Sequence, residues 1–429
     1  MASDSTTASG GNAQQRRVDL RNYLLGTGAY WTETLVDGAT RTLVLFYFDR
    51  LGYSPLKVAS LFVLYEIAGV VTNLVGGWLA ARLGLKITLF MGLAIQIVAL
   101  CMLGFAPASL LVVGYVMASQ ALSGIAKDLT KMSSKSAVKL VVSENDQSSL
   151  YRWVAILTGS KNALKGIGFF LGGVLLTLVG FQAAMLIMAA MVLIALLASS
   201  NLMRGYLGAP DKTAKFTQMF SNTRAVNVLA AARIFLFASR DVWFVVALPF
   251  FLYSVVGWTF WQVGTLLAVW VIGYGAVQAA APRFVRRRVD GHGGEPDGRT
   301  AIWLALGLAV CPAAIALALT AHVDPAIAIV LGLIPFGIVF ALNSAVHSYL
   351  ILAYADNDKV AMNVGFYYMA NAVGRLTGTV LSGLIYEWGG LSACLWASAG
   401  FILAAGLLSR LLPTEVARGT RPTRLSQVA

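Results

Sequence analysis

The chain has 429 residues, of which 58% are hydrophobic and 12% are charged. This composition excludes an ordinary soluble domain, and repeated apolar runs of about twenty residues indicate a helical protein that crosses a membrane many times. The net charge of +13 is explained by basic loops rather than by a nucleic-acid partner, since cytoplasmic loops of membrane proteins collect Lys and Arg. The three cysteines lie in separate apolar runs and are expected to be core thiols. We therefore expect no metal and no cofactor.

The apolar runs predict an all-α membrane protein with twelve transmembrane helices in two pseudo-symmetric six-helix bundles. The predicted spans are 22–48, 55–80, 87–106, 108–127, 151–178, 181–202, 224–254, 259–282, 301–320, 325–350, 361–386 and 391–411. The predicted parts of the chain are a cytoplasmic N-terminal tail (1–20), an N-terminal bundle (21–202), a cytoplasmic linker (203–223), a C-terminal bundle (224–411) and a cytoplasmic C-terminal tail (412–429). No cleavable signal peptide is expected, because residues 1–18 are polar throughout.

The distribution of basic residues predicts the orientation of the chain. The loops on one side hold nearly all of the Lys and Arg, whereas the other side shows little beyond Arg50 and Lys57. By the positive-inside rule, the basic side is cytoplasmic. Both termini are therefore expected in the cytoplasm.

A stripe of lysines begins at the end of the predicted fourth span. Lys127, Lys131, Lys135 and Lys139 recur every four residues, which would place them on one face of a short helix in the predicted cytoplasmic segment 128–150. The expected role of this stripe is contact with anionic headgroups or a topology signal. A funnel that gathers anions is the alternative.

An internal repeat relates the two predicted bundles. Residues 51–66 align with residues 256–271 at one constant offset, which places Gly52 on Gly257 and carries Arg82 onto Arg287. Parallel repeats of this kind are typical of transporters built from two related halves. The second span of each bundle is therefore predicted to correspond.

Charged residues are unevenly distributed among the spans. The third, sixth, ninth and twelfth spans carry none in their interiors, whereas the first, second, fifth, seventh and eleventh do, and the tenth carries Asn343 and His347. Because intramembrane charges normally face a bundle interior or an aqueous cavity, these other spans are expected to surround a transport path. Lys161 and Lys165 are the most informative pair, since one lysine at the centre of a bilayer helix costs roughly 2.5–3.5 kcal/mol. They lie four residues apart on one helical face.

These lysines either neutralise buried carboxylates or hold an anionic cargo. In the second case, either both bind the cargo, or one binds it while the other pairs with Asp37 or Glu66. Six cations (Arg41, Lys161, Lys165, Arg233, Arg240, Arg375) face four carboxylates (Glu33, Asp37, Glu66, Asp241) in the spans. Complete mutual pairing would leave buried cations over, which is costly unless an anion binds. The substrate-binding candidates are Arg41, Lys161, Lys165, Arg240, Arg375, Asn343 and Tyr30, and the proton or coupling candidates are Glu33, Asp37 and Glu66. Asp37 and Arg41 could also pair within their helix.

Two short motifs resemble the major facilitator superfamily. The loop "GGWLAARLGLK" at 76–86 resembles the superfamily's loop signature, with Ala81 in place of its acidic residue. Its matching residues Gly77, Arg82 and Gly84 are expected to form a gating loop. The patch "GFFLGG" at 168–173 is similar to the Gly-Pro-x-x-Gly-Gly patch of exporters, and we expect it to be a close-packing hinge toward the other bundle.

Longer segments carry a closer resemblance. They are 22–45, 51–78, 120–140, 157–173 and 240–252, and the fourth reads "LTGSKNALKGIGFFLGG". They resemble the organoarsenical efflux permeases of bacterial arsenic-resistance operons, which belong to the same superfamily. The resemblance covers most of residues 20–385.

The resemblance implies a secondary active transporter that exports 1-arseno-3-phosphoglycerate by alternating access and so gives arsenate resistance. It implies a bacterial inner (cytoplasmic) membrane location and a functional link to a cytoplasmic glyceraldehyde-3-phosphate dehydrogenase, which makes this compound when arsenate replaces phosphate. The expected partners are thus the small anionic organoarsenical and membrane lipid, and the protein is expected to be monomeric. A cargo with one phosphate and one arsenate group suits the surplus of buried cations.

Three other functions are alternatives to this one. An organic-phosphate or organic-anion importer or exchanger of the same fold is the main alternative. A membrane-embedded enzyme or sensor is disfavoured, because the three His are spread over separate elements and no catalytic constellation is evident. An exporter of hydrophobic cations is disfavoured because the buried cations would repel its cargo.

Overall fold

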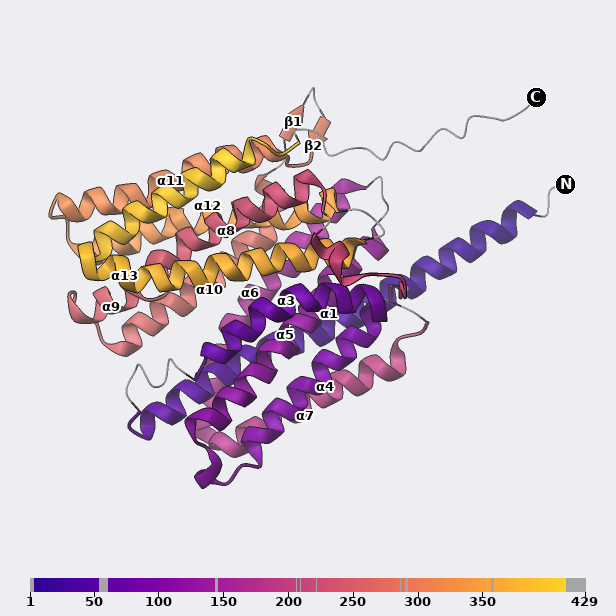
Figure 1. Ribbon diagram of the computed structural model, residues 1–429, viewed down its shortest axis with the longest axis horizontal. Helices are drawn as coiled ribbons and strands as arrows, with labels where there is room; N and C mark the ends of the chain where they lie inside the picture. The colour runs from indigo at the N-terminus through magenta and orange to yellow at the C-terminus, as the bar shows by residue number, and fades with distance from the viewer. Residues whose placement is uncertain are drawn as a thin grey trace.

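The computed structural model describes residues 4–53, 61–142, 146–205, 207–208, 210–220, 222–285, 287–289, 292–355 and 359–413. Side chains are described within these ranges from residue 18 onward, except at 49, 260–261, 287–289 and 292–294. The described chain is almost entirely helical, in two groups of helices that lie side by side (Figure 1). We name the group from α1 to α7 the N-terminal half and the group from α8 to α13 the C-terminal half.

The helices have the following bounds. The N-terminal half contains α1 (Asp4–Arg50), α3 (Val63–Leu83), α4 (Leu85–Gly104), α5 (Val113–Val141), α6 (Gln147–Leu178) and α7 (Phe181–Leu202). The C-terminal half contains α8 (Arg224–Phe244), α9 (Ala247–Ser254), α10 (Phe260–Phe284), α11 (Gly298–Thr320), α12 (Pro325–Tyr354) and α13 (Val360–Ser409). Short elements are η1 (Ala108–Leu110), η2 (Phe216–Phe220) and the antiparallel hairpin of β1 (Arg287–Val289) and β2 (His292–Gly294).

The described helices supply twelve spans. Helices α8 and α9 together make one span, and α13 makes two because it is kinked at Gly389 and Gly390, where Gly390 has a φ of 64°. Only glycine adopts that conformation readily. Eight helices are apolar enough to cross a membrane by composition alone. The three long helices outside this set, α1, α5 and α6, carry most of the buried charges of the N-terminal half. The predicted all-α fold of twelve spans is confirmed.

Local sequence explains where several helices begin. Thr259 and Gln262 form a reciprocal capping box at the start of α10, and Asp297 accepts a hydrogen bond from the Thr300 amide at the start of α11. Asp324 caps α12, whose first residue is Pro325. Such caps satisfy amides that have no partner inside the helix, and proline is tolerated at the first helical position.

The two halves repeat one local geometry. Gly52 follows α1 and Gly257 follows α9, and both glycines have a φ of 79°. These two residues are matched by the internal repeat in the sequence, so the same left-handed turn follows the first span of each half. The structure agrees with the alignment of the repeats.

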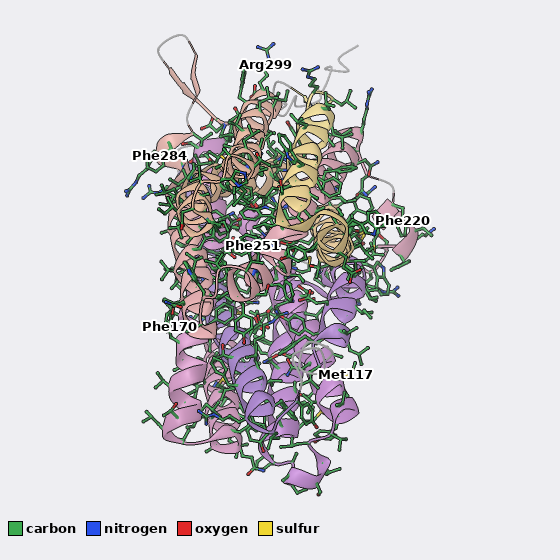
Figure 2. All side chains as sticks on the ribbon, turned by 90° about the vertical axis from the view of Figure 1, so that its left-hand side faces the viewer. Met117, Phe170, Phe220, Phe251, Phe284 and Arg299 are labelled. Carbon is green, nitrogen blue, oxygen red and sulfur yellow. The ribbon has the colours of Figure 1, made fainter. Side chains whose placement is uncertain are left out.

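The hydrophobic core shows at which end the halves meet. We name the end of the bundle that carries residues 203–220 the linker end; it lies on the right in Figure 1. One core cluster contains residues of both halves near this end, among them Val138, Tyr151, Tyr349 and Tyr368. Two further clusters each belong to a single half, and they reach the opposite end, which faces the viewer in Figure 2. The halves are therefore packed together at the linker end.

Two predicted boundaries differ from the structure. Helix α1 begins at Asp4 rather than at residue 22, so part of the predicted N-terminal tail is helical. Helix α5 continues to Val141, whereas the fourth span was predicted to stop at residue 127. Residues 128–138 of the predicted cytoplasmic segment are buried inside the bundle.

Candidate functional site

Three helices of the N-terminal half bring the predicted charged residues together. Asp37 on α1 accepts hydrogen bonds from Lys165 Nζ on α6 at 2.8 Å and from the Tyr65 hydroxyl on α3 at 2.5 Å. Arg41 on α1 donates to Glu66 on α3 at 2.6 Å. The intrahelical pair of Asp37 with Arg41 does not form, because each finds a partner on a neighbouring helix instead.

A chain of ion pairs crosses from the N-terminal to the C-terminal half. The guanidinium of Arg375 on α13 lies 3.7 Å from Glu66 and 3.3 Å from Asp241 on α8. Arg240 donates to Asp241 at 2.6 Å. Asp241 is fully buried, whereas the side chains of Glu66 and Arg375 are each 36% exposed. Charges on α1, α3, α8 and α13 are thus linked into one network, which we name the inter-half network.

Lys161 differs from the other predicted cations. It is half-buried on α6, one helical turn before Lys165. Among the residues that the structure describes, it makes no hydrogen bond and no ion pair, yet it lies within Coulombic range of Lys127, Lys131, Lys135 and Lys165. An unpaired cation in such surroundings is unfavourable unless an anion approaches it.

The buried stripe on α5 supplies site residues that were predicted to lie in a loop. Lys131 pairs with Asp128 at 2.5 Å, and Lys127 lies 4.0 Å from the same carboxylate. The Lys127 ammonium also lies 4.0 Å from the centroid of the Tyr65 ring. The expectation of headgroup contact is wrong for Lys131 and Lys135, which are buried. The sequence contains one indication that α5 continues into the bundle. Asp128 and the small residues near it recur at helical spacing, as expected for a buried helix face.

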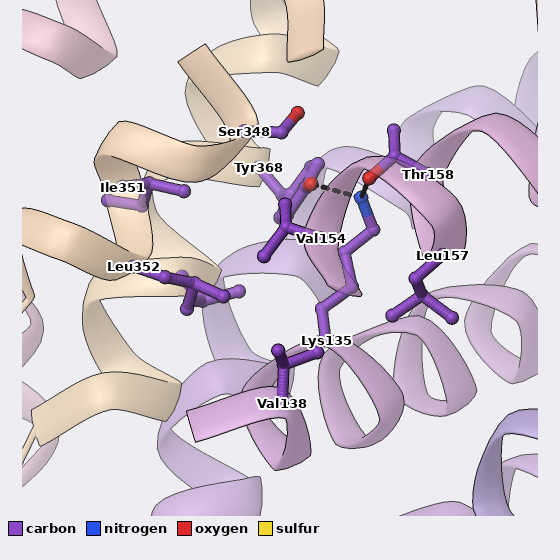
Figure 3. A pocket seen from close by; sticks show the side chains of 10 residues that line it. Lys135, Val138, Val154, Leu157, Thr158, Ser348, Ile351, Leu352 and Tyr368 are labelled. Atoms are coloured by element: carbon purple, nitrogen blue, oxygen red, sulfur yellow. Dashed lines mark hydrogen bonds between the residues drawn. The ribbon is translucent and has the colours of Figure 1, made fainter. Parts of the chain in front are cut away.

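Lys135 bridges the two halves at a small pocket on the linker side (Figure 3). Its ammonium donates to the hydroxyl of Thr158 on α6 at 3.0 Å and to the hydroxyl of Tyr368 on α13. Lys135 is only 5% exposed. Among the described residues, the hydrogen-bond partners of its ammonium are neutral hydroxyls, and no carboxylate compensates its charge.

The remaining predicted residues are placed as follows. Glu33 is fully buried on α1, where one of its carboxyl oxygens lies 3.4 Å from the Thr130 hydroxyl and the other has no partner among the described residues. Tyr30 is buried one turn before Glu33. Asn343 is buried on α12, and no described contact brings it to the cations. Arg233, also buried, donates to Asn371 on α13.

The predicted gating-loop residues lie at the linker end. A Cβ on Gly77 would stand 2.8 Å from the Ala361 carbonyl and 2.9 Å from the Cα of Gly365, so α3 and α13 cross there in backbone contact. Gly84 has a φ of 88° and faces Gly208 and Pro210 of the linker. The guanidinium of Arg82 lies 5.4 Å from the Trp78 ring centroid. These placements suit a gating role, which remains a proposal.

The glycine patch at 168–173 packs within its own half. A Cβ on Gly168 would meet the Leu35 carbonyl at 2.3 Å, and one on Gly172 would meet the Ala39 carbonyl at 2.4 Å, both on α1. The expected contact with the other half is therefore wrong for these residues. Gly159, two turns earlier on α6, makes that contact, since its Cβ would meet Ala279 of α10 at 2.3 Å.

Twelve spans in two related halves, with an ion-pair network at their contact, are typical of membrane transporters. The model of the Major Facilitator Superfamily matches residues 27–351. The chain belongs to this superfamily.

Comparison with solved structures supports the fold. A bacterial homologue of the iron transporter ferroportin in its outward-facing state has a TM-score of 0.71 at 12% identity, covering 91% of this chain and 98% of that one. The human organic anion transporter MFSD10 (TETRAN) has a TM-score of 0.70 at 14% identity, covering 90% and 99%. The proton:xylose symporter XylE has a TM-score of 0.67 at 13% identity, covering 92% and 95%. No curated protein matches the chain.

Proposed function

We propose that this transporter exports a small, multiply anionic organoarsenical, 1-arseno-3-phosphoglycerate, by alternating access. The observation that carries the proposal is the surplus of positive charge between the halves. Nine described cations (Arg41, Lys127, Lys131, Lys135, Lys161, Lys165, Arg233, Arg240, Arg375) face five carboxylates (Glu33, Asp37, Glu66, Asp128, Asp241). Three of these cations, Lys135, Lys161 and Arg233, have no carboxylate within ion-pair distance among the described residues.

The chemistry of the cations suits a cargo with two oxyanion groups. The guanidinium groups of Arg41, Arg240 and Arg375 present planar pairs of donors, which match the oxygens of phosphate or arsenate. Lys161 and Lys165 are compact charges that can follow a moving ligand. We assign one oxyanion to the lysines of α6 and the other to the arginines of the inter-half network.

In an alternating-access mechanism, the transport path opens first at one end of the bundle and then at the other. In the conformation described, the halves share a hydrophobic core at the linker end, and the charged network lies beyond it. Rocking one half against the other would separate the linker-end contacts and expose the cations to the side that carries the linker. If that side is the cytoplasm, as the basic loops favour, the cargo enters there after the dehydrogenase has made it.

Glu33 is our proposed proton carrier. Asp37 and Glu66 are held in ion pairs, whereas Glu33 has no cationic hydrogen-bond donor among the described residues. An isolated buried carboxylate is costly, and taking up a proton removes that cost. Glu33→Gln is expected to abolish uptake driven by a proton gradient while leaving substrate exchange in place. Vesicle assays of both processes would check this, with Glu387→Gln as the exposed control; unchanged gradient-driven uptake would contradict it.

The cargo is tested by uptake into everted vesicles. The organoarsenical is made in the assay by glyceraldehyde-3-phosphate dehydrogenase with arsenate, and its uptake is followed with and without a proton gradient. We expect accumulation of arsenic only when the dehydrogenase is active. Equal uptake of labelled glycerol phosphate, with no preference for the arseno-ester, would favour an organic-phosphate exchanger instead.

A further inference from the structure

Tyr368 occupies a position that suits an anion. The ammonium groups of Lys131 and Lys135 lie 4.8 Å and 4.7 Å from the centroid of its ring. The Tyr368 hydroxyl also accepts a hydrogen bond from Lys135 (Figure 3). An aromatic face is electron-rich and attracts cations, and a phenol oxygen is a hydrogen-bond acceptor. One side chain of the C-terminal half thus offers two lysines of the N-terminal half the features of an oxyanion.

The partners of Lys131 and Lys135 belong to different halves of the protein. Asp128 and Thr158 belong to the N-terminal half, so Lys131 keeps its carboxylate and Lys135 keeps one hydroxyl when the halves separate. Tyr368 belongs to α13 and would leave with the C-terminal half. Lys135 would then be a cation without its second acceptor, on the linker side of Lys161.

We propose that Lys131, Lys135 and Thr158 form a linker-side subsite for a phosphate- or arsenate-type group, which Tyr368 fills while the linker end is closed. The proposal rests on the proposed transport of organic anions and deepens it. Cargo and Tyr368 compete for the same two ammonium groups. Arrival of the anion therefore favours the conformation open at the linker end, and departure of the anion toward Lys161 allows Tyr368 to return.

The competition predicts a specific effect of removing the Tyr368 hydroxyl. A hydrogen bond from a charged donor contributes more to stability than one between neutral groups. The closed conformation competes with cargo binding, so the apparent affinity for the cargo falls as the population of the closed conformation rises. Tyr368→Phe is expected to increase the apparent affinity for a phosphate ester about tenfold. Tyr349→Phe is the matched control, because the Tyr349 hydroxyl contacts Gln147 of the other half without involving a lysine. It should change the affinity by less than about twofold.

The experiment measures protection of a single cysteine at the pocket. Val154 lines this pocket and is buried, so Val154→Cys, in a background with Cys101, Cys311 and Cys394 replaced, should react with an impermeant thiol reagent only when the linker end opens. Everted vesicles are titrated with 3-phosphoglycerate. Glycerate, which has the same carboxylate but no phosphate group, is the control. Residue 154 lines the same pocket as Lys135, so a phosphate bound there covers the cysteine even though the linker end is open. We therefore expect 3-phosphoglycerate to slow the reaction, and Lys135→Met to abolish this protection. Lys215→Met, an exposed lysine of the linker, should preserve it.

Each outcome decides one part of the proposal. Protection that persists in Lys135→Met would overturn the subsite, even if the organoarsenical is taken up normally. Equal shifts in Tyr368→Phe and Tyr349→Phe would overturn the competition by Tyr368. If protection of the cysteine depends on Lys135 but the protein takes up no organoarsenical, the subsite is supported and the proposed cargo is wrong. Thermal denaturation of each variant confirms that it is folded before its titration is compared.

Discussion

Lys161→Met is expected to abolish most transport while making the protein more stable. The ammonium of Lys161 has no hydrogen-bond or ion-pair partner among the described residues and lies near four other lysines. Removing it relieves repulsion in the empty protein, so the midpoint of thermal denaturation should rise. In the loaded protein, the same change removes a charged partner of the cargo, which costs about 2–5 kcal/mol and lowers uptake efficiency roughly thirtyfold or more.

Lys165→Met is the matched comparison for this prediction. It should also reduce uptake, but it should lower the midpoint of denaturation because Asp37 loses its ion pair. Uptake into vesicles and thermal denaturation in detergent measure the two effects separately. A stable, fully active Lys161→Met variant would contradict the assignment of Lys161 to the cargo. So would a Lys161→Met variant that is as destabilised as Lys165→Met, because Lys161 would then have a structural partner.

The spans could be predicted because burial in a membrane leaves a long, regular signal. Helix α7 runs from Phe181 to Leu202, the same residues as the predicted sixth span. The repeat was visible for a similar reason, since Gly52 and Gly257 must both adopt a left-handed conformation that restricts their identity. Structural features that depend on local backbone conformation or on a long apolar run can therefore be predicted from a single sequence.

The course of α5 could not be predicted from the positive-inside rule, on which the expected orientation also rests. Lysines at 127, 131 and 135 have the pattern of a cytoplasmic segment, but Lys131 is buried against Asp128, and Lys135 is buried against Thr158 and Tyr368. Two of these partners lie on other helices, so no local pattern shows that the charges are satisfied inside the bundle. The positive-inside rule counts charges in loops and cannot separate them from charges that line a path.

The identity of the charged helices was predictable, but the pairing of their side chains was not. The sequence places Asp37 and Arg41 one turn apart, which favours an intrahelical pair. Helix packing instead brings Lys165 to Asp37 and Glu66 to Arg41. The close α1–α6 crossing at Gly168 fixes the separation of those two helices, so backbone contact through glycine favours the pair of Asp37 with Lys165.

The ion pair of Asp37 with Lys165 is expected to stabilise the N-terminal half more than the pair of Arg41 with Glu66 does, because it is more buried. Breaking a fully buried pair costs roughly 3–5 kcal/mol, because one charge is left without compensation. Asp37 is 3% exposed but Lys165 is 22% exposed, so we expect Asp37→Asn to lower the free energy of unfolding by about 2–3 kcal/mol. The double variant Asp37→Asn/Lys165→Met should recover much of this loss, since neither charge then remains alone.

A double-mutant cycle measured by denaturant unfolding in detergent checks this coupling. The pair of Arg41 with Glu66 is the control, because it has a shorter distance, 2.6 Å, but side chains that are 26% and 36% exposed. Solvent screening should hold its coupling below about 1 kcal/mol. Equal coupling in both pairs would show that distance rather than burial governs these contacts. In that case Lys165 would be screened as Arg41 is, and its release from Asp37 to bind a cargo anion would cost little.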